Sequence, residues 1–130
     1  MNDLFKARFV RGGRDVRTGL DCQGLFLEVM RRYGHDVTDR DVAAYATFIV
    51  AAAINSELAS GKWQRIDAPE EGCAVGLALD PENPAMAQHL GVCIGRDRFI
   101  HIMETHGVKV SAVEDRFFRD KIRGFYRWVG

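Results

Sequence analysis

The spacing of apolar residues predicts a helix in the first third of the chain. Between residues 22 and 33 the apolar side chains recur at helical spacing, at Leu25, Phe26, Val29 and Met30. Asp21 precedes this stretch, where its carboxylate can cap a helix by accepting hydrogen bonds from backbone N–H groups. Gly34 follows it, where helices commonly end. The pattern therefore predicts a helix over 22–33 with Cys22 in its first turn.

A second predicted helix contains the longest apolar run of the chain, residues 42–54. Thr38 begins a TDRD sequence that resembles a capping box, in which the Asp41 side chain would bond back to the backbone N–H of Thr38. The helix is therefore expected to begin there. It is expected to run to about Ser60, before Gly61. Its middle is apolar on nearly every side, which predicts central burial. The run is shorter than the roughly 20 residues that span a bilayer, so no membrane insertion is expected.

After Pro69 the apolar residues form short runs separated by glycine, proline or aspartate. These runs cover residues 73–79, 89–95, 98–103, 107–113 and 121–129. Runs of this length with turn residues between them are typical of antiparallel strands joined by tight turns. The expected fold class is therefore α+β, with N-terminal helices packed on an antiparallel β-sheet.

Alternation within two of these runs predicts which side chains share a face of the sheet. In 89–95, one face carries Leu90, Val92 and Ile94, and the other carries His89, Gly91 and Cys93. In 121–129, one face carries Ile122, Tyr126 and Trp128, and the other carries Lys121, Arg123 and Arg127. The first pattern turns His89 away from the aliphatic core. The second predicts a closing strand with one solvated face.

The composition limits the class of protein and its partners. At 130 residues the chain is expected to form a single domain, 1–130. Hydrophobic residues make up 47% of it and charged residues 28%, as in a soluble globular protein. Eighteen basic residues balance eighteen acidic ones, so no overall field would recruit nucleic acid. The first residues lack a secretory signal, which predicts synthesis in the cytoplasm.

Cys22 is the first candidate for chemistry. The three cysteines are odd in number and sparse, which predicts reduced thiols rather than a disulfide framework. A cysteine at a helix N-terminus lies near the positive end of the helix dipole, which lowers the pKa of its thiol, although the charge of Asp21 opposes this effect. Cys22 is then either a reactive nucleophile or a small buried hydrophobe. Cys73 and Cys93 are most simply interpreted as buried thiols.

Two histidines add a candidate base and a residue to orient it. His89 opens one predicted strand and His101 lies near the end of the next, with the turn 95–98 between them. Such a hairpin can bring the two imidazoles side by side, so that His101 holds the tautomer of His89 while His89 takes a thiol proton. Each histidine taken alone is more often a satisfied structural residue. Cys22 and the two histidines are also possible zinc ligands, but no CxxC or HxxxH spacing supports a metal site, and no cofactor is expected.

Three separated motifs resemble the NlpC-type peptidoglycan cysteine peptidases, which are papain-like enzymes. GLDCQGLFLEVMRRYG (19–34) is similar to their DCSGLV helix, and AQHLGVCIGRDRFIHIME (87–104) to their HVGIYLG hairpin followed by FIHA. GVKVSAV (107–113) and KIRGFYR (121–127) resemble their last strands. The resemblance runs from Phe9 to Arg127, and the ending GFYR is similar to the phage-tail-associated branch.

The resemblance implies a fold, a reaction and a role for each candidate residue. The fold would be a circularly rearranged papain-like domain, with the cysteine helix packed on the sheet that bears both histidines. Cys22 would be the nucleophile, His89 the general base and His101 the orienting residue of a Cys-His-His triad. The reaction would be acyl transfer through a thioester, at the bond between γ-D-glutamate and a diamino acid in peptidoglycan stem peptides.

Two of the departures from the family pattern concern predicted site residues. Phe9 stands where the family usually has a tyrosine before a Gly-Gly pair, and Gln23 stands where the family has a serine. With Asp21, these residues are predicted to line the substrate and oxyanion side of the site. The departures keep open an alternative function, a catalytically weak or inactive structural phage-tail component. Other tail proteins would then be partners, and the virion tail the place of action.

The remaining aromatic and imidazole side chains are expected to have no chemical role. His35 and His106 follow or precede glycines in predicted loops, which predicts exposure to solvent. The large aromatic residues are expected to be packing residues, and these are Trp63, Phe117, Phe118 and Trp128. Trp63 is also a candidate to border the substrate groove.

Overall fold

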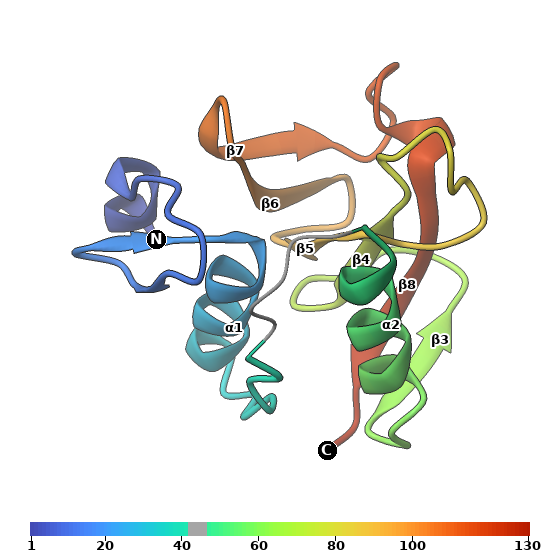
Figure 1. Cartoon of the computed structure of the whole chain (residues 1–130). Coiled ribbons are helices and arrows are strands. Elements are labelled where there is room, and N and C mark those ends of the chain that lie inside the picture. Colours follow the sequence, from blue (N-terminus) through green and yellow to red (C-terminus); the bar gives the residue numbers. More distant parts are fainter. Residues whose placement is uncertain (42–46) are drawn as a thin grey trace.

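One six-stranded antiparallel sheet is the main scaffold in the computed structural model, which describes residues 1–41 and 47–130 (Figure 1). Its strands are β3 (Trp63–Ile66), β4 (Ala74–Leu77), β5 (His89–Cys93), β6 (Arg98–Met103), β7 (Gly107–Ala112) and β8 (Ile122–Trp128). Their order across the sheet is β3-β8-β4-β5-β6-β7. The predicted α+β class, the antiparallel pairing and the five predicted strands are confirmed. β3 was not predicted, because its middle residues Gln64 and Arg65 are polar and exposed at the sheet edge.

Helices and a small ribbon complete the described part of the chain. They are η1, a 3-10 helix (Asn2–Lys6), the ribbon of β1 (Arg14–Asp15) and β2 (Gly19–Leu20), α1 (Cys22–Arg32), α2 (Thr47–Leu58) and the 3-10 turn η2 (Arg119–Lys121). α1 packs against β5 and β6 on one side and against β1 and β2 on another. The cysteine helix is thus fixed between the N-terminal ribbon and the centre of the main sheet.

The two faces of the main sheet carry separate apolar clusters. The face toward α1 includes Val92, Ile100, Ile102 and Val108, packed with Leu25, Phe26, Val29 and Met30 of the helix. The opposite face includes Cys73, Val75, Leu77, Cys93, Phe99 and Phe118. Because Leu90, Val92 and Ile94 belong to the first cluster and Cys93 to the second, the predicted alternation in this strand is confirmed.

The predicted alternation in β8 is wrong at its first residue. Ile122 packs in the cluster on the far face with Phe125, whereas Tyr126 and Trp128 pack against the cluster on the α1 face. The pairing with β4 shifts register between Gly76 and Leu77, so a β-bulge separates Ile122 from the rest of the strand. A bulge inserts one residue and reverses the faces that follow it.

α1 begins and ends where the sequence predicts. The Asp21 side chain accepts a hydrogen bond from Gly24 N at 2.8 Å, which is the expected N-cap contact. At the other end Tyr33 closes the helix, and Gly34 has φ of 84°, a left-handed conformation that suits glycine. Cys22 therefore occupies the first position of the helix.

Gly24 sets how closely α1 approaches the N-terminal segment. A Cβ atom at this position would overlap the carbonyl oxygen of Gly13. Alanine normally stabilises a helix relative to glycine by about 0.5–1 kcal/mol, but the overlap with fixed backbone outweighs that gain. We expect Gly24→Ala to lower the free energy of unfolding by about 1–2 kcal/mol, measured by urea titration.

Gly95→Ala is the matched control for this substitution. A Cβ atom at Gly95 would meet Asp97 Oδ1 at 3.6 Å, an ordinary contact, so a change within about 0.5 kcal/mol is expected. Equal stability of the Gly24→Ala variant and the wild type would contradict the close approach of α1 to Gly13.

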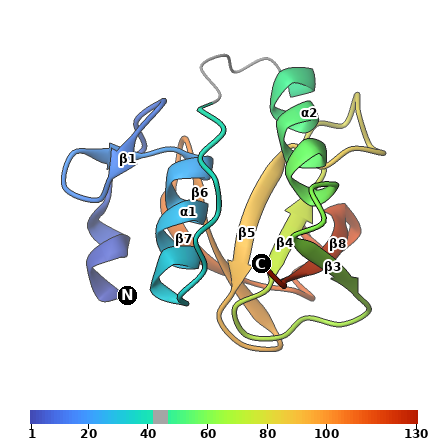
Figure 2. The ribbon, with the colours of Figure 1, turned by 90° about the horizontal axis from the view of Figure 1, so that it is seen from below.

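The predicted start and burial of the second helix are wrong. Residues 38–41 are not helical, and Asp41 has φ of 48°. The carboxylate of Asp39 accepts from Asp41 N at 2.8 Å and so forms a turn instead of the expected capping box. The predicted residues 42–46 lie outside the described residues. Within α2, Phe48 is 69% exposed while Ile54 is buried, because α2 lies at the outside of the molecule and turns one side inward (Figure 2).

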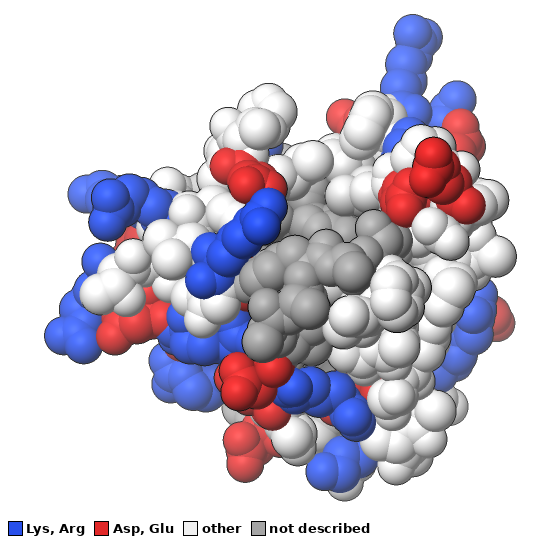
Figure 3. All heavy atoms as spheres, viewed as in Figure 1, with Lys and Arg blue, Asp and Glu red and all other residues white. Residues whose placement is uncertain are grey.

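In the part of the chain that the structure describes, no helix is long and apolar enough to cross a bilayer. On the face seen in Figure 3, positive and negative side chains are intermixed.

Candidate active site

Asp21 organises the start of the cysteine helix. It is 3% exposed, and its carboxylate accepts hydrogen bonds from Gly24 N at 2.8 Å, Gly12 N at 3.0 Å and Arg14 Nη1 at 2.7 Å. Asp21 therefore joins the glycine pair, the ribbon and the helix, and its role toward substrate stays a prediction. The half-buried side chain of Cys22 begins directly after it.

Arg14 joins Asp21 to the loop that follows α1. Its Nε donates to Asp39 Oδ2 at 2.9 Å, and Nη1 donates to Asp21. Gln23, predicted to contact substrate, donates from Nε2 to Asp39 Oδ1 at 3.1 Å. Gln23, which replaces the expected serine, and Arg14 thus both donate to the carboxylate of Asp39. Both side chains therefore stabilise the loop next to Cys22.

Loss of Arg14 should destabilise the protein through Asp21. Arg14→Ala removes a charged donor from a buried carboxylate, which costs about 1.5 kcal/mol, near the low end for such bonds because Arg14 is partly exposed. Arg17→Ala removes a surface arginine that pairs with exposed Asp15, and little change is expected. Urea titration of both variants measures the difference, and equal midpoints would contradict the structural role given to Arg14.

A cavity of about 220 Å³ lies beside Cys22 and is lined by residues of both α1 and α2. Asp21, Cys22 and Gln23 line it together with Gln88 and Leu90 of the β5 segment. Its apolar lining comes from Phe26, Leu27, Val37, Val50, Ala53 and Ile54. The cavity therefore offers an apolar recess next to the thiol.

Phe9 and Trp63 lie outside the described lining of this cavity. Phe9 forms an isolated bridge with Leu20 and packs against the core cluster of α1. Trp63 is buried and donates from Nε1 to Glu57 Oε2 at 2.7 Å, so it contacts a residue that lines the cavity. Of the predicted substrate-side residues, the structure places Asp21 and Gln23 at the cavity, whereas Phe9 is partly buried against the core cluster.

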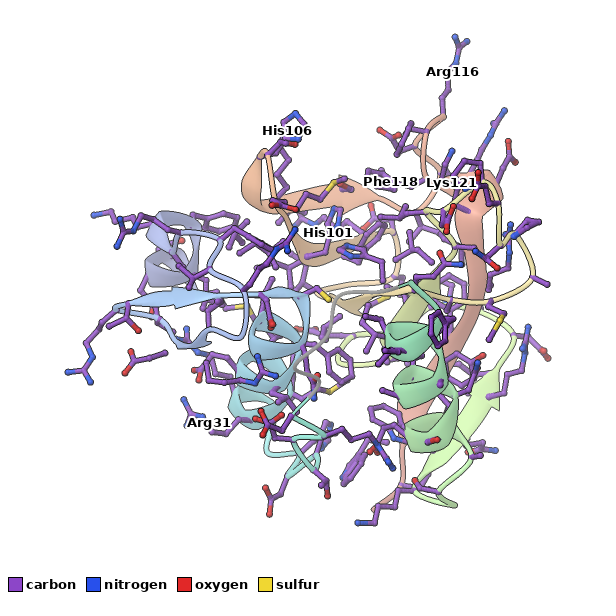
Figure 4. All side chains as sticks on the ribbon, viewed as in Figure 1. Arg31, His101, His106, Arg116, Phe118 and Lys121 are labelled. Atoms are coloured by element: carbon purple, nitrogen blue, oxygen red, sulfur yellow. The ribbon has the colours of Figure 1, made fainter. Side chains whose placement is uncertain are left out.

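His89 and His101 form a buried pair on neighbouring strands, as the hairpin pattern predicts. His89 Nε2 lies 2.9 Å from His101 Nδ1, and the rings meet at 76°. His101 Nε2 lies 2.9 Å from Ser111 Oγ on β7, and the rings of Phe99 and Phe118 pack against the imidazole (Figure 4). Sequence reasoning missed Ser111, although strand alternation on β7 could have identified it.

The structure brings the histidines together but joins neither of them to Cys22 by a hydrogen bond. The described part of the chain contains no such bond, although Cys22 shares its cavity with Gln88 and Leu90, the two neighbours of His89. Nδ1 of His89 has no hydrogen-bond partner among the described residues. Every fully buried side-chain nitrogen among these residues does have a partner, so Nδ1 of His89 is not fully buried. This nitrogen therefore reaches accessible space. The catalytic roles of these residues stay a prediction.

The pKa of the Cys22 thiol is raised, whereas the position of Cys22 at a helix start was expected to lower it. Burial, and after it the charge of Asp21, raises the pKa of the Cys22 thiol to about 11, against smaller opposing effects of the Gln23 backbone and Arg14. Burial lowers the pKa of His89 to about 3 and that of His101 to about 4, with a smaller effect of Lys109 on His101. At neutral pH the thiol and both imidazoles are therefore uncharged.

The other predicted side chains mostly pack as expected. Cys73 and Cys93 are buried and their thiols share a hydrogen bond. Phe118 is buried, but Phe117 is 53% exposed, because its side chain lies over Lys121 at the surface rather than in the core. His106 is exposed, whereas His35 is partly covered by the ring of Trp128.

Among the described residues, no three His, Cys, Asp or Glu side chains are grouped to hold a metal ion.

The fold resembles solved structures that share little sequence with this chain. One is a protein similar to lipoprotein, of the NLP/P60 family, from Staphylococcus aureus subsp. aureus Mu50, with 18% identity and a TM-score of 0.66. That match covers 99% of this chain and 40% of the other, so this chain spans less than half of that protein's length. Another is the NlpC/p60 domain of the peptidoglycan hydrolase SagA, with 18% identity, a TM-score of 0.57 and coverage of 96% and 88%.

A sequence comparison assigns the family. No curated protein matches the chain. The family model of the NlpC/P60 family matches residues 6–127, a range that contains the cysteine helix and both histidine strands. The chain therefore belongs to the NlpC/P60 family.

Proposed function

We propose that this protein is a cysteine peptidase that hydrolyses peptidoglycan stem peptides, at the bond between γ-D-glutamate and a diamino acid. Membership of the NlpC/P60 family and the likeness of its fold to a peptidoglycan hydrolase domain support a cell-wall peptidase. The observation that carries the proposal is the buried hydrogen bond between His89 and His101, beside a helix that begins with Cys22. A cysteine, a base and an orienting group are the parts that thiol acyl transfer requires.

In the proposed mechanism the thiol loses its proton only as it reacts. Because the thiol and imidazole are both neutral, Nδ1 of His89 would take the proton as Cys22 Sγ attacks the scissile carbonyl. The backbone N–H of Cys22 at the helix start would donate to the oxyanion. His89 would then protonate the leaving amine, and water would hydrolyse the thioester. Catalytic hydrogen bonds are often long without substrate, so substrate is expected to bring Cys22 and His89 together.

Digestion of purified sacculi tests this activity. The protein is expected to release soluble peptide fragments from the stem peptides, while heat-unfolded protein releases none. Muropeptide profiles that stay unchanged with well-folded protein would contradict the proposal.

The setting that we propose is a phage tail or a prophage particle. The resemblance of the ending GFYR (124–127) to the phage-tail branch motivates it. The protein would be made in the bacterial cytoplasm and would reach the wall on a virion, with other tail proteins as partners. Mass spectrometry of particles from the producing strain should then find the chain, and its absence from all particles would contradict this setting.

A second candidate function is a structural tail component without activity. The missing hydrogen bond between Cys22 and His89 and the raised pKa of the thiol favour it. The rate at which iodoacetamide alkylates Cys22 separates the two functions. A peptidase should lose much of this rate in His89→Ala, because the base is gone, whereas an inactive component should show the same slow rate in both proteins.

A further inference from the structure

We propose that Ser111 is a positioning residue, whose hydroxyl sets the tautomers of both histidines so that Nδ1 of His89 is free to accept a proton. The inference rests on the proposed function for its catalytic meaning. Its geometry rests on two contacts, His89 Nε2 to His101 Nδ1 and His101 Nε2 to Ser111 Oγ, each 2.9 Å long.

The chain of contacts has two possible directions, and they leave His89 in different states. A neutral imidazole carries one N–H donor and one acceptor nitrogen. If His101 donates from Nε2 to Ser111, its Nδ1 must accept from His89 Nε2, and Nδ1 of His89 keeps its lone pair. If Ser111 instead donates to His101, the order reverses and Nδ1 of His89 carries the proton. Only the first direction gives a base for the Cys22 thiol.

The surroundings of Ser111 favour the first direction. Ser111 is half-buried and lines a surface cleft of about 450 Å³, so its own hydroxyl proton can bond to water while its oxygen accepts from His101. Phe99 pairs with Ser111 across β6 and β7 and packs on the His101 ring, which holds the imidazole in reach of the hydroxyl.

Burial, and after it the charge of Lys109, lowers the pKa of His101 and keeps its ring neutral, as the tautomer argument requires. Lys109 lies directly opposite His101 in the strand register, and its positive charge disfavours a second proton on the ring. His89 is the other titratable neighbour, and burial keeps it neutral too. A neutral pair has one proton to place on each ring, and the contact with Ser111 decides where.

Ser111→Val and Ser111→Thr form a matched pair for the test. Both side chains are branched at Cβ and of similar volume, but only threonine keeps the hydroxyl. Nitrogen-15 NMR of the histidine rings reports which nitrogen is protonated. The wild type and Ser111→Thr should show His101 protonated at Nε2 and His89 at Nε2. Ser111→Val should shift both rings toward the Nδ1-protonated form, because Nε2–H of His101 would face a methyl group.

Kinetics give the second readout. In Ser111→Val, kcat for stem-peptide cleavage and the rate of Cys22 alkylation should fall about tenfold with KM unchanged, the equivalent of one hydrogen bond. Ser111→Thr should restore both rates, and the exposed-serine control Ser56→Ala should leave both unchanged. Identical tautomers in Ser111→Val and Ser111→Thr would overturn the inference. If wild-type protein proved inactive, the proposed function would fail, while the tautomer spectra would still decide whether Ser111 orders the pair.

Discussion

Cys22→Ala is expected to lower the rate of stem-peptide cleavage in sacculi by at least about a thousandfold. The sulfur is the atom that forms the thioester, and losing a covalent nucleophile removes most of the catalysis that its base and oxyanion site provide. The fold should remain, because Asp21 keeps its donors and the helix cap does not involve the thiol. The measurement is the initial rate of peptide release from purified sacculi, paired with a urea titration.

Cys73→Ala is the control for thiol loss in general. Cys73 is buried in the cluster on the far face of the sheet, away from the cavity beside Cys22. This variant should lose some stability and keep its activity. A Cys22→Ala protein that retained more than a few per cent of the wild-type rate would show that another group carries the reaction.

Acid should destabilise the protein well above the pH at which its carboxylates titrate. The pKa of His89 is lowered to about 3 and that of His101 to about 4, from an ordinary 6.5. Between pH 6.5 and about 4 the unfolded chain therefore binds two protons that the folded protein does not. The free energy of unfolding should fall with pH in this window, at up to about 1.4 kcal/mol per pH unit for each histidine.

Urea titrations at pH 7.0, 6.0, 5.0 and 4.5 measure this slope, with two variants as comparisons. His89→Gln removes one of the buried imidazoles and should lower the slope by about half. His106→Asn replaces an exposed histidine and should leave it unchanged. A wild-type stability that stays constant from pH 6.5 to 4.5 would contradict the neutral buried pair.

Local patterns in the sequence predicted the parts of the fold whose contacts are local. The helix after Asp21 and the strand pair with His89 and His101 depend on spacing and on a short turn, and both form as expected. The start of α2 failed because Asp39 is held by Arg14, 25 residues earlier in the chain, and by a turn to Asp41. No local pattern contains that contact.

The chemistry of the site was only partly predictable for the same reason. The pairing of the imidazoles followed from the hairpin, whereas Ser111 depends on a third strand that pairs with β6. The pKa of Cys22 is raised because tertiary packing buries the thiol, an effect that outweighs the helix start and is invisible in the sequence around it. The bulge that displaces Ile122 likewise arises from pairing between β4 and β8.

Mass spectrometry of stem peptides after digestion compares wild-type protein with Cys22→Ala at the level of the bond. The proposed function predicts fragments with a new free amino group on the diamino acid in the wild-type digest, and intact stem peptides with Cys22→Ala. Identical spectra from the two well-folded proteins, whether both cleaved or both intact, would contradict a peptidase that uses Cys22.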